Sequence, residues 1–266
     1  MKVFEVNYRI LFSILLAVFM SACASRTLDN IQSEINPSSE SSELQKRAAI
    51  RLQLAVDYYQ QGQRKVALEE LRQALLVSPD LVDAYSLRAV IFMDLNETQR
   101  AEDNFLHALK LAPNNSDIAN NYGWFLCQNG REKESIGYFE KVLKDTTYPT
   151  PVKALGNAGV CSLRLKDTVN AERYFSIGFR AQPSNPSINA NLAKIYYDKG
   201  EFEKAKFYID RVVKAEVMAA DVLWLAIKIE NKLEDHLALN SLGIQLRRRH
   251  PNSKEYGLFQ RGAFNE

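Results

Sequence analysis

A set of small residues and prolines recurs at intervals of 34 residues along most of this chain. Ala55 and Ala89 are 34 residues apart, and so are Pro79 and Pro113. Corresponding positions continue through third, fourth and fifth copies, and a degenerate sixth copy ends at Pro251. A period of this length is typical of a repeat protein, in which each unit buries its apolar face only against its neighbours.

Within each unit the small residues stand at two positions, and a large apolar residue follows each of them. The small residues let two antiparallel helices approach closely, the larger ones fill the space around that contact, and proline ends the second helix. No alternation of apolar and polar residues competes with this pattern. The spacing is that of the tetratricopeptide repeat (TPR). It predicts an all-α, right-handed superhelical TPR solenoid of about six helix-turn-helix repeats over residues 48–251.

Two segments depart from the period. Between the third and fourth units it lengthens by two residues, at DTTYPTP (Asp145–Pro151). The two prolines there predict an ordered, non-helical connection. Residues 252–266 follow the last unit, and we expect them to form a capping segment, because the end of a solenoid must cover its last apolar face.

The N-terminus has the layout of a secretory signal. Lys2 and Arg9 precede an apolar run, Ile10–Met20, and small residues follow it. As a helix this run spans about 16 Å, roughly half of a bilayer core, so a permanent membrane span is not expected. Met20-Ser21-Ala22-Cys23 resembles a bacterial lipobox. This resemblance implies a lipoprotein signal peptide at residues 1–22 and lipidation of Cys23; the alternative is a plain signal peptide with an incidental cysteine.

The residues after the predicted cleavage site are polar and rich in serine, as in NPSSESSE. Such a segment cannot bury enough apolar surface to offset the entropy of ordering it. Residues 23–47 are therefore interpreted as the lipidated N-terminus and a flexible linker. Ala24 rather than aspartate follows Cys23, and in the lipoproteins that this resembles this implies delivery to the outer membrane.

Cys127 and Cys161 are the cysteines of the repeat region, and they lie 34 residues apart. This spacing places them on the first helices of adjacent repeats, whose axes are about 8–10 Å apart, so a disulfide is within reach. In an oxidising compartment we expect that bond; two buried reduced thiols are the alternative. Catalysis and metal binding are disfavoured, because the three histidines are scattered and no closely spaced Cys/His cluster exists.

The composition excludes several functions. The net charge is +2 and 25% of the residues are charged, which describes an ordinary surface and not that of a nucleic-acid-binding protein. The basic stretch LRRRHP is explained by the favourable position of positive charge at a helix C-terminus. No phosphate-binding loop is present in the sequence. We therefore expect no enzyme activity, no cofactor and no metal site.

Repeat solenoids bind other proteins through side chains of their first helices. These positions form an apolar groove in the first two repeats and a more polar, basic one in the later repeats. Some of them could instead be covered by a neighbouring helix or by the linker. The predicted groove residues are Leu52, Val56, Tyr59, Ser86, Val90, Met93, Asn120, Trp124, Val160, Leu163, Arg164, Lys194, Tyr197 and Trp224.

Three stretches carry a more specific resemblance. Together with the lipobox and the six repeats, NNYGWFLCQNGREKESIGYFEKVL, NAGVCSLR and YGLFQRGAFNE resemble the type IV pilus biogenesis/stability lipoproteins, often called PilF or PilW. The resemblance covers nearly the whole chain. It implies a pilotin, that is, a lipoprotein anchored in the outer membrane and facing the periplasm; we expect it to be a monomer. Its implied partner is the secretin PilQ, which it would help to localise, assemble or stay stable without catalysis. The alternative is a scaffold for envelope enzymes such as peptidoglycan hydrolases.

Overall fold

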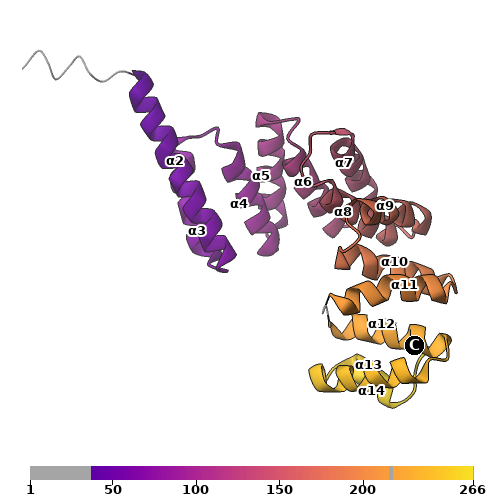
Figure 1. Ribbon diagram of the computed structural model, residues 1–266. Helices are drawn as coiled ribbons and strands as arrows, with labels where there is room; N and C mark the ends of the chain where they lie inside the picture. The colour runs from indigo at the N-terminus through magenta and orange to yellow at the C-terminus, as the bar shows by residue number, and fades with distance from the viewer. Residues whose placement is uncertain (1–36, 216–217, 266) are drawn as a thin grey trace, which may run out of the picture. The chain divides into compact units, whose positions relative to one another are not determined.

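The computed structural model describes residues 37–215 and 218–265. Within these ranges the chain is made of helices, α2 to α14, without a strand, which confirms the all-α TPR prediction (Figure 1). None of the described helices is long and apolar enough to cross a membrane. The predicted signal peptide (1–22), the lipidation site Cys23 and the first part of the predicted linker lie outside the described residues.

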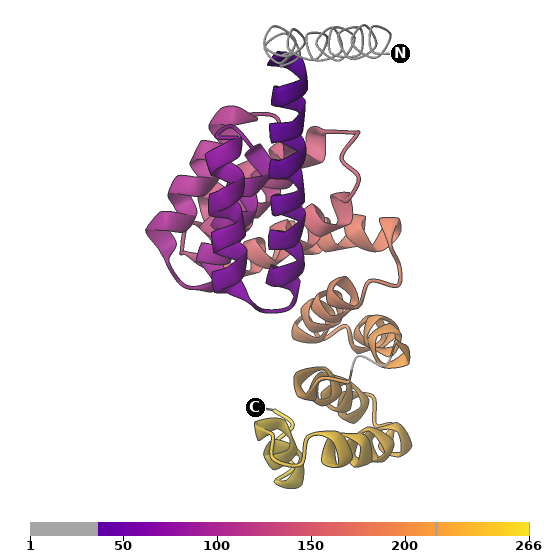
Figure 2. The same cartoon turned by 90° about the vertical axis from the view of Figure 1, so that its left-hand side faces the viewer.

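The chain divides into two compact units, residues 1–84 and 85–266. In the first unit α2 (Pro37–Gln60) and α3 (Arg64–Val77) form an antiparallel hairpin (Figure 2). An ion pair, Arg51 Nη1 to Glu70 Oε2 at 2.7 Å, joins the two helices. Small residues at the contact let them approach closely. The buried residues of the hairpin are Ala48, Ala55, Ala67, Leu71 and Ala74.

The first helix begins earlier than the sequence suggested. Residues 37–47 were expected to belong to the flexible linker, whereas α2 starts at Pro37. Proline is favoured at the first position of a helix, and a polar composition does not prevent a helix from extending once an adjoining segment has nucleated it. An ion pair between Lys46 and Glu43, one turn apart, adds local support at 2.8 Å.

The second unit repeats the same hairpin, and each pair packs against the next (Figure 1). Its paired helices are α4 (Val82–Asp94), which begins just before the boundary, with α5 (Thr98–Leu111); α6 (Ser116–Gln128) with α7 (Glu132–Lys144); α8 (Pro151–Arg164) with α9 (Thr168–Ala181); α10 (Pro186–Asp198) with α11 (Phe202–Lys214); and α12 (Ala220–Lys232) with α13 (His236–Arg249).

The turn inside each hairpin marks the register of the repeats. Every one of these turns contains a residue with φ between +59° and +77°, the left-handed region in which glycine is favoured. Successive left-handed residues are 34, 34, 36, 34 and 34 residues apart, so the two-residue insertion falls where the sequence placed it. The six residues are Gly62, Asn96, Gly130, Lys166, Gly200 and Glu234.

Close contacts between helices explain why two positions hold glycine. A Cβ atom added to Gly123 would lie 2.9 Å from the ring of Phe139, and one added to Gly159 would lie 2.5 Å from the ring of Phe175. Both phenylalanines are fully buried. The glycines therefore set how closely the two helices of repeats three and four can pack.

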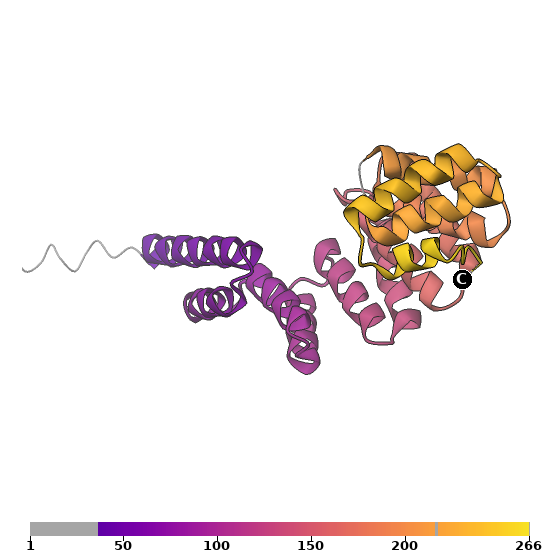
Figure 3. The same ribbon diagram turned by 90° about the horizontal axis from the view of Figure 1, so that it is seen from below.

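The insertion and the C-terminus are both ordered. Between α7 and α8, Tyr148 is buried and its hydroxyl donates to Asp117 Oδ1 at 3.2 Å. At the other end α14 (Lys254–Gln260) lies where the capping segment was predicted and packs against α12 and α13 (Figure 3). The ring of Phe264 follows it and stacks on Trp224, with centroids 5.8 Å apart.

Candidate protein-binding face

The first helices of the second unit present a series of hollows between neighbours. The hollow between α4 and α6 has a volume of ≈ 310 Å³ and is lined by Met93, Trp124 and Gln128 together with residues of the α4–α5 turn. Ser86, Val90 and Met93 on α4 are all partly buried. Trp124 is partly buried too, so its indole ring contributes to both the core and the hollow.

Arg164 on α8 is tied to the end of α6. Its guanidinium donates to the carbonyl oxygen of Cys127 at 2.8 Å and to Gln128 Oε1 at 3.2 Å. The same group lies 5.9 Å from the centre of the Trp124 ring. Because an arginine over an indole face is attracted by the ring electrons, these contacts hold Trp124 and a positive charge at one place on the face.

The two cysteines lie directly beneath this place. Cys127 and Cys161 are fully buried, with their Sγ atoms 2.04 Å apart and their Cα atoms 5.9 Å apart, and so are placed in a disulfide. They join α6 to α8, the first helices of adjacent repeats. A thiol nucleophile would need an accessible sulfur and a base, and this geometry supplies neither.

Two larger hollows flank α10, and Asn191 and Lys194 line both of them. The hollow toward α8 has a volume of ≈ 560 Å³ and includes Leu163. The hollow toward α12 has a volume of ≈ 400 Å³ and includes Trp224 and Lys228. Side chains of α10 therefore form the ridge between two neighbouring cavities.

Lys194 on α10 pairs with an acidic residue of its own helix and is repelled by Lys228 on α12. Lys194 Nζ lies 2.9 Å from Asp198 Oδ2, one turn later on α10. Burial lowers the pKa of the Lys228 ammonium, and the positive charge of Lys194 lowers it further, while the negative charge of Asp198 raises it. The Lys228 ammonium also lies 5.3 Å from the centre of the Tyr197 ring. Burial raises the pKa of the Tyr197 hydroxyl.

Two residues expected in the groove are buried. Asn120 is 0% exposed, because its side chain points toward α8, where Asn157 Nδ2 donates to its Oδ1 at 3.1 Å. Trp224 is 6% exposed, because Phe264 of the C-terminal segment covers it. Val160 and Leu163 are partly buried, and Lys194 is exposed.

The groove residues of the first repeat belong to the other unit. Leu52, Val56 and Tyr59 lie on α2, each partly buried. Their place in one groove with α4 stays a prediction.

Sequence reasoning missed a row of asparagines and one lysine. Asn121, Asn157 and Asn191 each stand two residues before the small residue of their first helix, at intervals of 36 and 34 residues. That periodicity was present in the sequence and could have identified them. Lys228 lines the hollow between α10 and α12, and only its neighbours in space reveal it.

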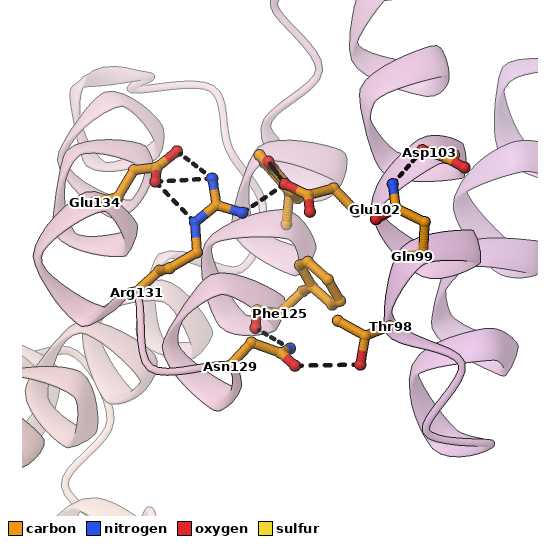
Figure 4. A network of polar contacts seen from close by, with 9 residues as sticks. Thr98, Gln99, Glu102, Asp103, Phe125, Asn129, Arg131 and Glu134 are labelled. Carbon is orange, nitrogen blue, oxygen red and sulfur yellow. Dashed lines mark hydrogen bonds and ion pairs between the residues drawn. The ribbon is translucent and has the colours of Figure 1, made fainter.

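A network of polar contacts joins the second repeat to the third. Arg131 bridges Glu102 of α5 and Glu134 of α7 (Figure 4). The Tyr122 hydroxyl also donates to Glu102 Oε1, at 2.9 Å. The hydrogen bond from Arg131 lowers the pKa of Glu102, against the opposing effect of burial. Across the turns Thr98 Oγ1 donates to Asn129 Oδ1 at 3.4 Å.

In the described part of the chain no group of three or more His, Cys, Asp or Glu side chains is placed to hold a metal ion. His107 packs its ring against Tyr85, with centroids 4.1 Å apart, and His250 Nε2 lies 2.5 Å from the carbonyl oxygen of Met218. Both histidines are thus used in local packing.

Comparison with known proteins finds the same repeat, and it finds relatives that are type IV pilus proteins. Models of the tetratricopeptide repeat match residues 52–116, 104–136 and 186–216. The type IV pilus assembly protein PilF of Pseudomonas aeruginosa is 32% identical over 209 residues, which cover 79% of this chain and 83% of that protein.

Two solved structures resemble about four fifths of this chain. The crystal structure of PilW, described as a widely conserved type IV pilus biogenesis factor, has a TM-score of 0.73 and 34% identity, covering 80% of this chain and 98% of PilW. The structure of Pseudomonas aeruginosa PilF has a TM-score of 0.77 and 30% identity, covering 84% of this chain and 99% of PilF.

Proposed function

This chain belongs to the family of the type IV pilus assembly protein PilF, and on that premise we propose that it acts as a pilotin. It binds the secretin PilQ, or its subunits, and promotes the localisation, multimerisation or stability of that channel at the outer membrane. The action is non-catalytic. The observation that carries the proposal is the family relationship over about four fifths of the chain.

The shape of the first-helix face supports a binding role. Side chains such as Met93, Trp124 and Lys194 border open hollows between adjacent helices. Concave sites that combine apolar walls with a few polar groups are typical of ligand and peptide recognition. A solenoid also offers such a face over several repeats, so an extended partner segment could contact many of them at once.

The N-terminal sequence supports a place at the membrane. The lipobox-like Met20-Ser21-Ala22-Cys23 would give the mature protein a lipid anchor, and Ala24 favours the outer membrane. Anchoring by more than one acyl chain is stable, because each buried methylene contributes about 0.8 kcal/mol. The polar residues after Cys23 would then hold the repeats on the periplasmic side.

Deletion of the gene tests the proposal. We expect loss of secretin multimers from the outer membrane fraction and loss of surface pili, both restored by the wild-type gene. Multimers are measured by immunoblotting of unheated membranes, and pili by shearing and electron microscopy. Intact multimers and pili with altered cell-wall turnover would instead favour the scaffold for peptidoglycan hydrolases.

A further inference from the structure

The second helices of the larger unit all carry a basic residue at the same position of their last turn. Successive members of this set are 34, 36, 34 and 34 residues apart, which is also the spacing of the left-handed turn residues. Because successive repeats pack side by side, the set forms a row along one edge of the unit. This basic row consists of Lys110 on α5, Lys144 on α7, Arg180 on α9, Lys214 on α11 and Arg248 on α13.

The side chains of the basic row are not engaged elsewhere in the described part of the chain. All five are exposed, and no side-chain hydrogen bond or ion pair joins any of them to another described residue. Two carboxylates, Glu140 and Asp210, lie one helical turn before Lys144 and Lys214. Glu140 Oε1 instead accepts from the Tyr174 hydroxyl at 3.0 Å. The positive charges of the row are therefore available to a partner.

The helix dipole alone does not explain the row. A positive charge is favoured in the last turn of any helix. The first helices α2, α4, α6 and α10 nevertheless have no basic residue there, and α8 and α12 have one each. Since the two helices of a hairpin are antiparallel, their dipoles oppose each other at each edge of the repeats. The charged side chains therefore decide the sign of the field at that edge.

The opposite edge of the larger unit, where the hairpin turns lie, has the opposite charge at the equivalent helix ends. Four of the five second helices are preceded by an acidic N-cap residue, and only α7 differs, with Arg131. The four are Glu97, Asp167, Glu201 and Asp235. These helices are thus acidic where they begin and basic where they end. A body with this polarity turns its basic edge toward a negatively charged surface.

The carboxylates near the basic row are used in local hydrogen bonds. Asp117 Oδ1 accepts from the Tyr148 hydroxyl at 3.2 Å, and Asp145 Oδ2 accepts from the Ser116 hydroxyl at 2.6 Å. Asp221 Oδ1 accepts from the backbone N–H of the next residue at 2.9 Å. A fourth carboxylate, Glu255, lies in the first turn of α14. The last turns of the second helices hold nine basic residues, so this edge keeps an excess of positive charge.

The positive charge is densest over α9, α11 and α13. The last turn of α13 alone has three exposed arginines, Arg247 to Arg249. The hollows of the first-helix face do not include Arg180, Lys214 or Arg248. A protein partner gains most of its affinity from side chains seated in shaped pockets, whereas an anionic bilayer attracts basic residues by charge alone. Exposed bases without a pocket therefore suit a lipid surface.

The proposed lipid anchor brings such a surface within reach. The chain between Cys23 and Pro37 can extend to at most about 50 Å. A helix of 14 residues, the length of α9, is only about 21 Å long. The tether therefore allows the repeats to lie against the membrane that holds the acyl chains.

We propose that the edge formed by the ends of α9, α11 and α13 rests on the anionic phospholipids of the membrane that carries the lipid anchor. Arg180, Lys214 and Arg248 contact the lipid phosphates, and the hairpin turns point away from the bilayer. The acyl chains hold the protein at the membrane, and the basic edge fixes its orientation there. This inference rests on the lipid anchorage in the proposed function.

The first test measures binding without the acyl chains. The purified mature chain with Cys23→Ser is sedimented with vesicles of phosphatidylethanolamine and phosphatidylglycerol, or with vesicles of phosphatidylcholine alone. We expect binding to the phosphatidylglycerol vesicles at about 10 mM salt, where charges act over about 30 Å. Most of it should be lost at about 0.15 M salt, where the range falls to about 8 Å. The neutral vesicles should not bind.

Matched charge variants locate the contact. A basic residue near an anionic surface strengthens binding by about fivefold, so removing three should weaken it by at least about tenfold. The test variant combines Arg180→Gln, Lys214→Gln and Arg248→Gln. The control makes the same change of net charge at three exposed lysines near the hairpin turns, and it should bind as the wild type does. It combines Lys133→Gln, Lys166→Gln and Lys232→Gln. Circular dichroism checks that both are folded.

The second test measures orientation with the lipidated protein. A donor dye is attached through Ser184→Cys, in the loop between α9 and α10, or through Leu165→Cys, in the turn between α8 and α9; both positions are exposed. The vesicles contain phosphatidylglycerol and an acceptor dye on a lipid headgroup. We expect more energy transfer from position 184 than from position 165. The triple variant of the basic row should abolish this difference.

Three results would overturn the inference: no binding to phosphatidylglycerol vesicles at low salt, equal binding by the folded triple variant, or equal energy transfer from the two labels. Binding of soluble polyglutamate by a protein that ignores vesicles would also overturn it, in favour of an acidic protein. The deletion experiment reports separately on the proposed function. Vesicle binding by a protein whose loss leaves pili intact would retain the inference and reject the pilotin role. Lost secretin multimers without vesicle binding would do the reverse.

Discussion

At the scale of single residues, two glycines of one helix are in opposite situations. Gly156 and Gly159 both lie within α8, but a Cβ atom at Gly156 would meet nothing within 4 Å, whereas one at Gly159 would lie 2.5 Å from the Phe175 ring. Phe175 is fully buried, so its ring can move only by disturbing the core. The difference between the two positions can be measured directly.

We predict that Gly159→Ala lowers the free energy of unfolding by about 1–3 kcal/mol, because a buried contact becomes overpacked. Gly156→Ala, three residues away, should raise it by up to about 1 kcal/mol, because alanine is the better helix former. Urea unfolding followed by circular dichroism measures both. Equal stability of the two variants would mean that the helices of repeat four can separate without cost.

The Glu102 carboxylate gives a pH-dependent prediction. The hydrogen bond from Arg131 holds its pKa below the usual value of 4.5. The folded state therefore favours the charged form, and this stabilisation is present above pH 4.5 and is lost as the pH falls through the lower, folded-state pKa. Partial exposure of the pair limits the effect to about 1 kcal/mol.

Glu102→Gln should accordingly destabilise the protein at pH 7, and its difference from the wild type should shrink in acid. Glu134→Gln is the control, since this carboxylate also contacts Arg131 but its side chain is 47% exposed. We expect an effect below about 0.5 kcal/mol for it. Urea unfolding at a series of pH values makes the comparison, and a pH-independent difference for Glu102→Gln would contradict the assignment.

At the scale of helices, the hairpins were predictable from the sequence because their determinants are local. Small residues at Gly123 and Gly159 and left-handed residues in the turns impose the period directly. The orientation of single side chains was harder to predict from the sequence. Adjacent helical residues differ by about 100° in direction, so Asn120 points into the α6–α8 contact while Asn121 stays on the face.

Contacts between distant segments explain the remaining differences. Trp224 stands at a groove position of α12, but Phe264, forty residues later, covers it. The repeat pattern carries no information about a capping segment that lies outside it. The early start of α2 at Pro37 has a similar origin, because a helix nucleated by packing extends into polar sequence that composition alone assigns to a linker.

The pairing of Cys127 with Cys161 belongs to this scale, since it joins two first helices. Closing a loop of 34 residues stabilises a protein by roughly 3–4 kcal/mol in the chain-entropy model. We predict that the double variant Cys127→Ala with Cys161→Ala unfolds at lower urea concentration by about that amount. Reduction of the wild type should have the same effect, and the variant should not respond to reductant.

Counting free thiols tests whether Cys127 and Cys161 form a disulfide. Protein unfolded without reductant should show no reactive thiol at positions 127 and 161, and two after reduction. Two reactive thiols before reduction would show that both cysteines are buried in reduced form. The stability difference would then measure lost packing alone.

At the scale of the whole molecule, the proposed function depends on where the repeats are held. The repeats offer a face, but capture of a secretin subunit at the outer membrane also requires that the face be kept there. A tether converts binding into an effectively intramolecular event and raises the local concentration of the site. In the proposed function that placement rests on Cys23 and Ala24.

Two substitutions at these positions should separate lipidation from sorting. Cys23→Ser should abolish lipid attachment, so that the protein leaves the membrane fraction while its repeats remain folded. Ala24→Asp should keep the lipid but shift the protein to the inner membrane, as in the lipoproteins that the motif resembles. Intact mass spectrometry detects the acyl chains, and density-gradient fractionation separates the two membranes.

Both variants should reduce secretin multimers in the outer membrane, because the binding face is displaced from its partner although its chemistry is unchanged. Full multimer assembly with the unlipidated protein would mean that the face finds its partner by diffusion and that the tether serves another purpose.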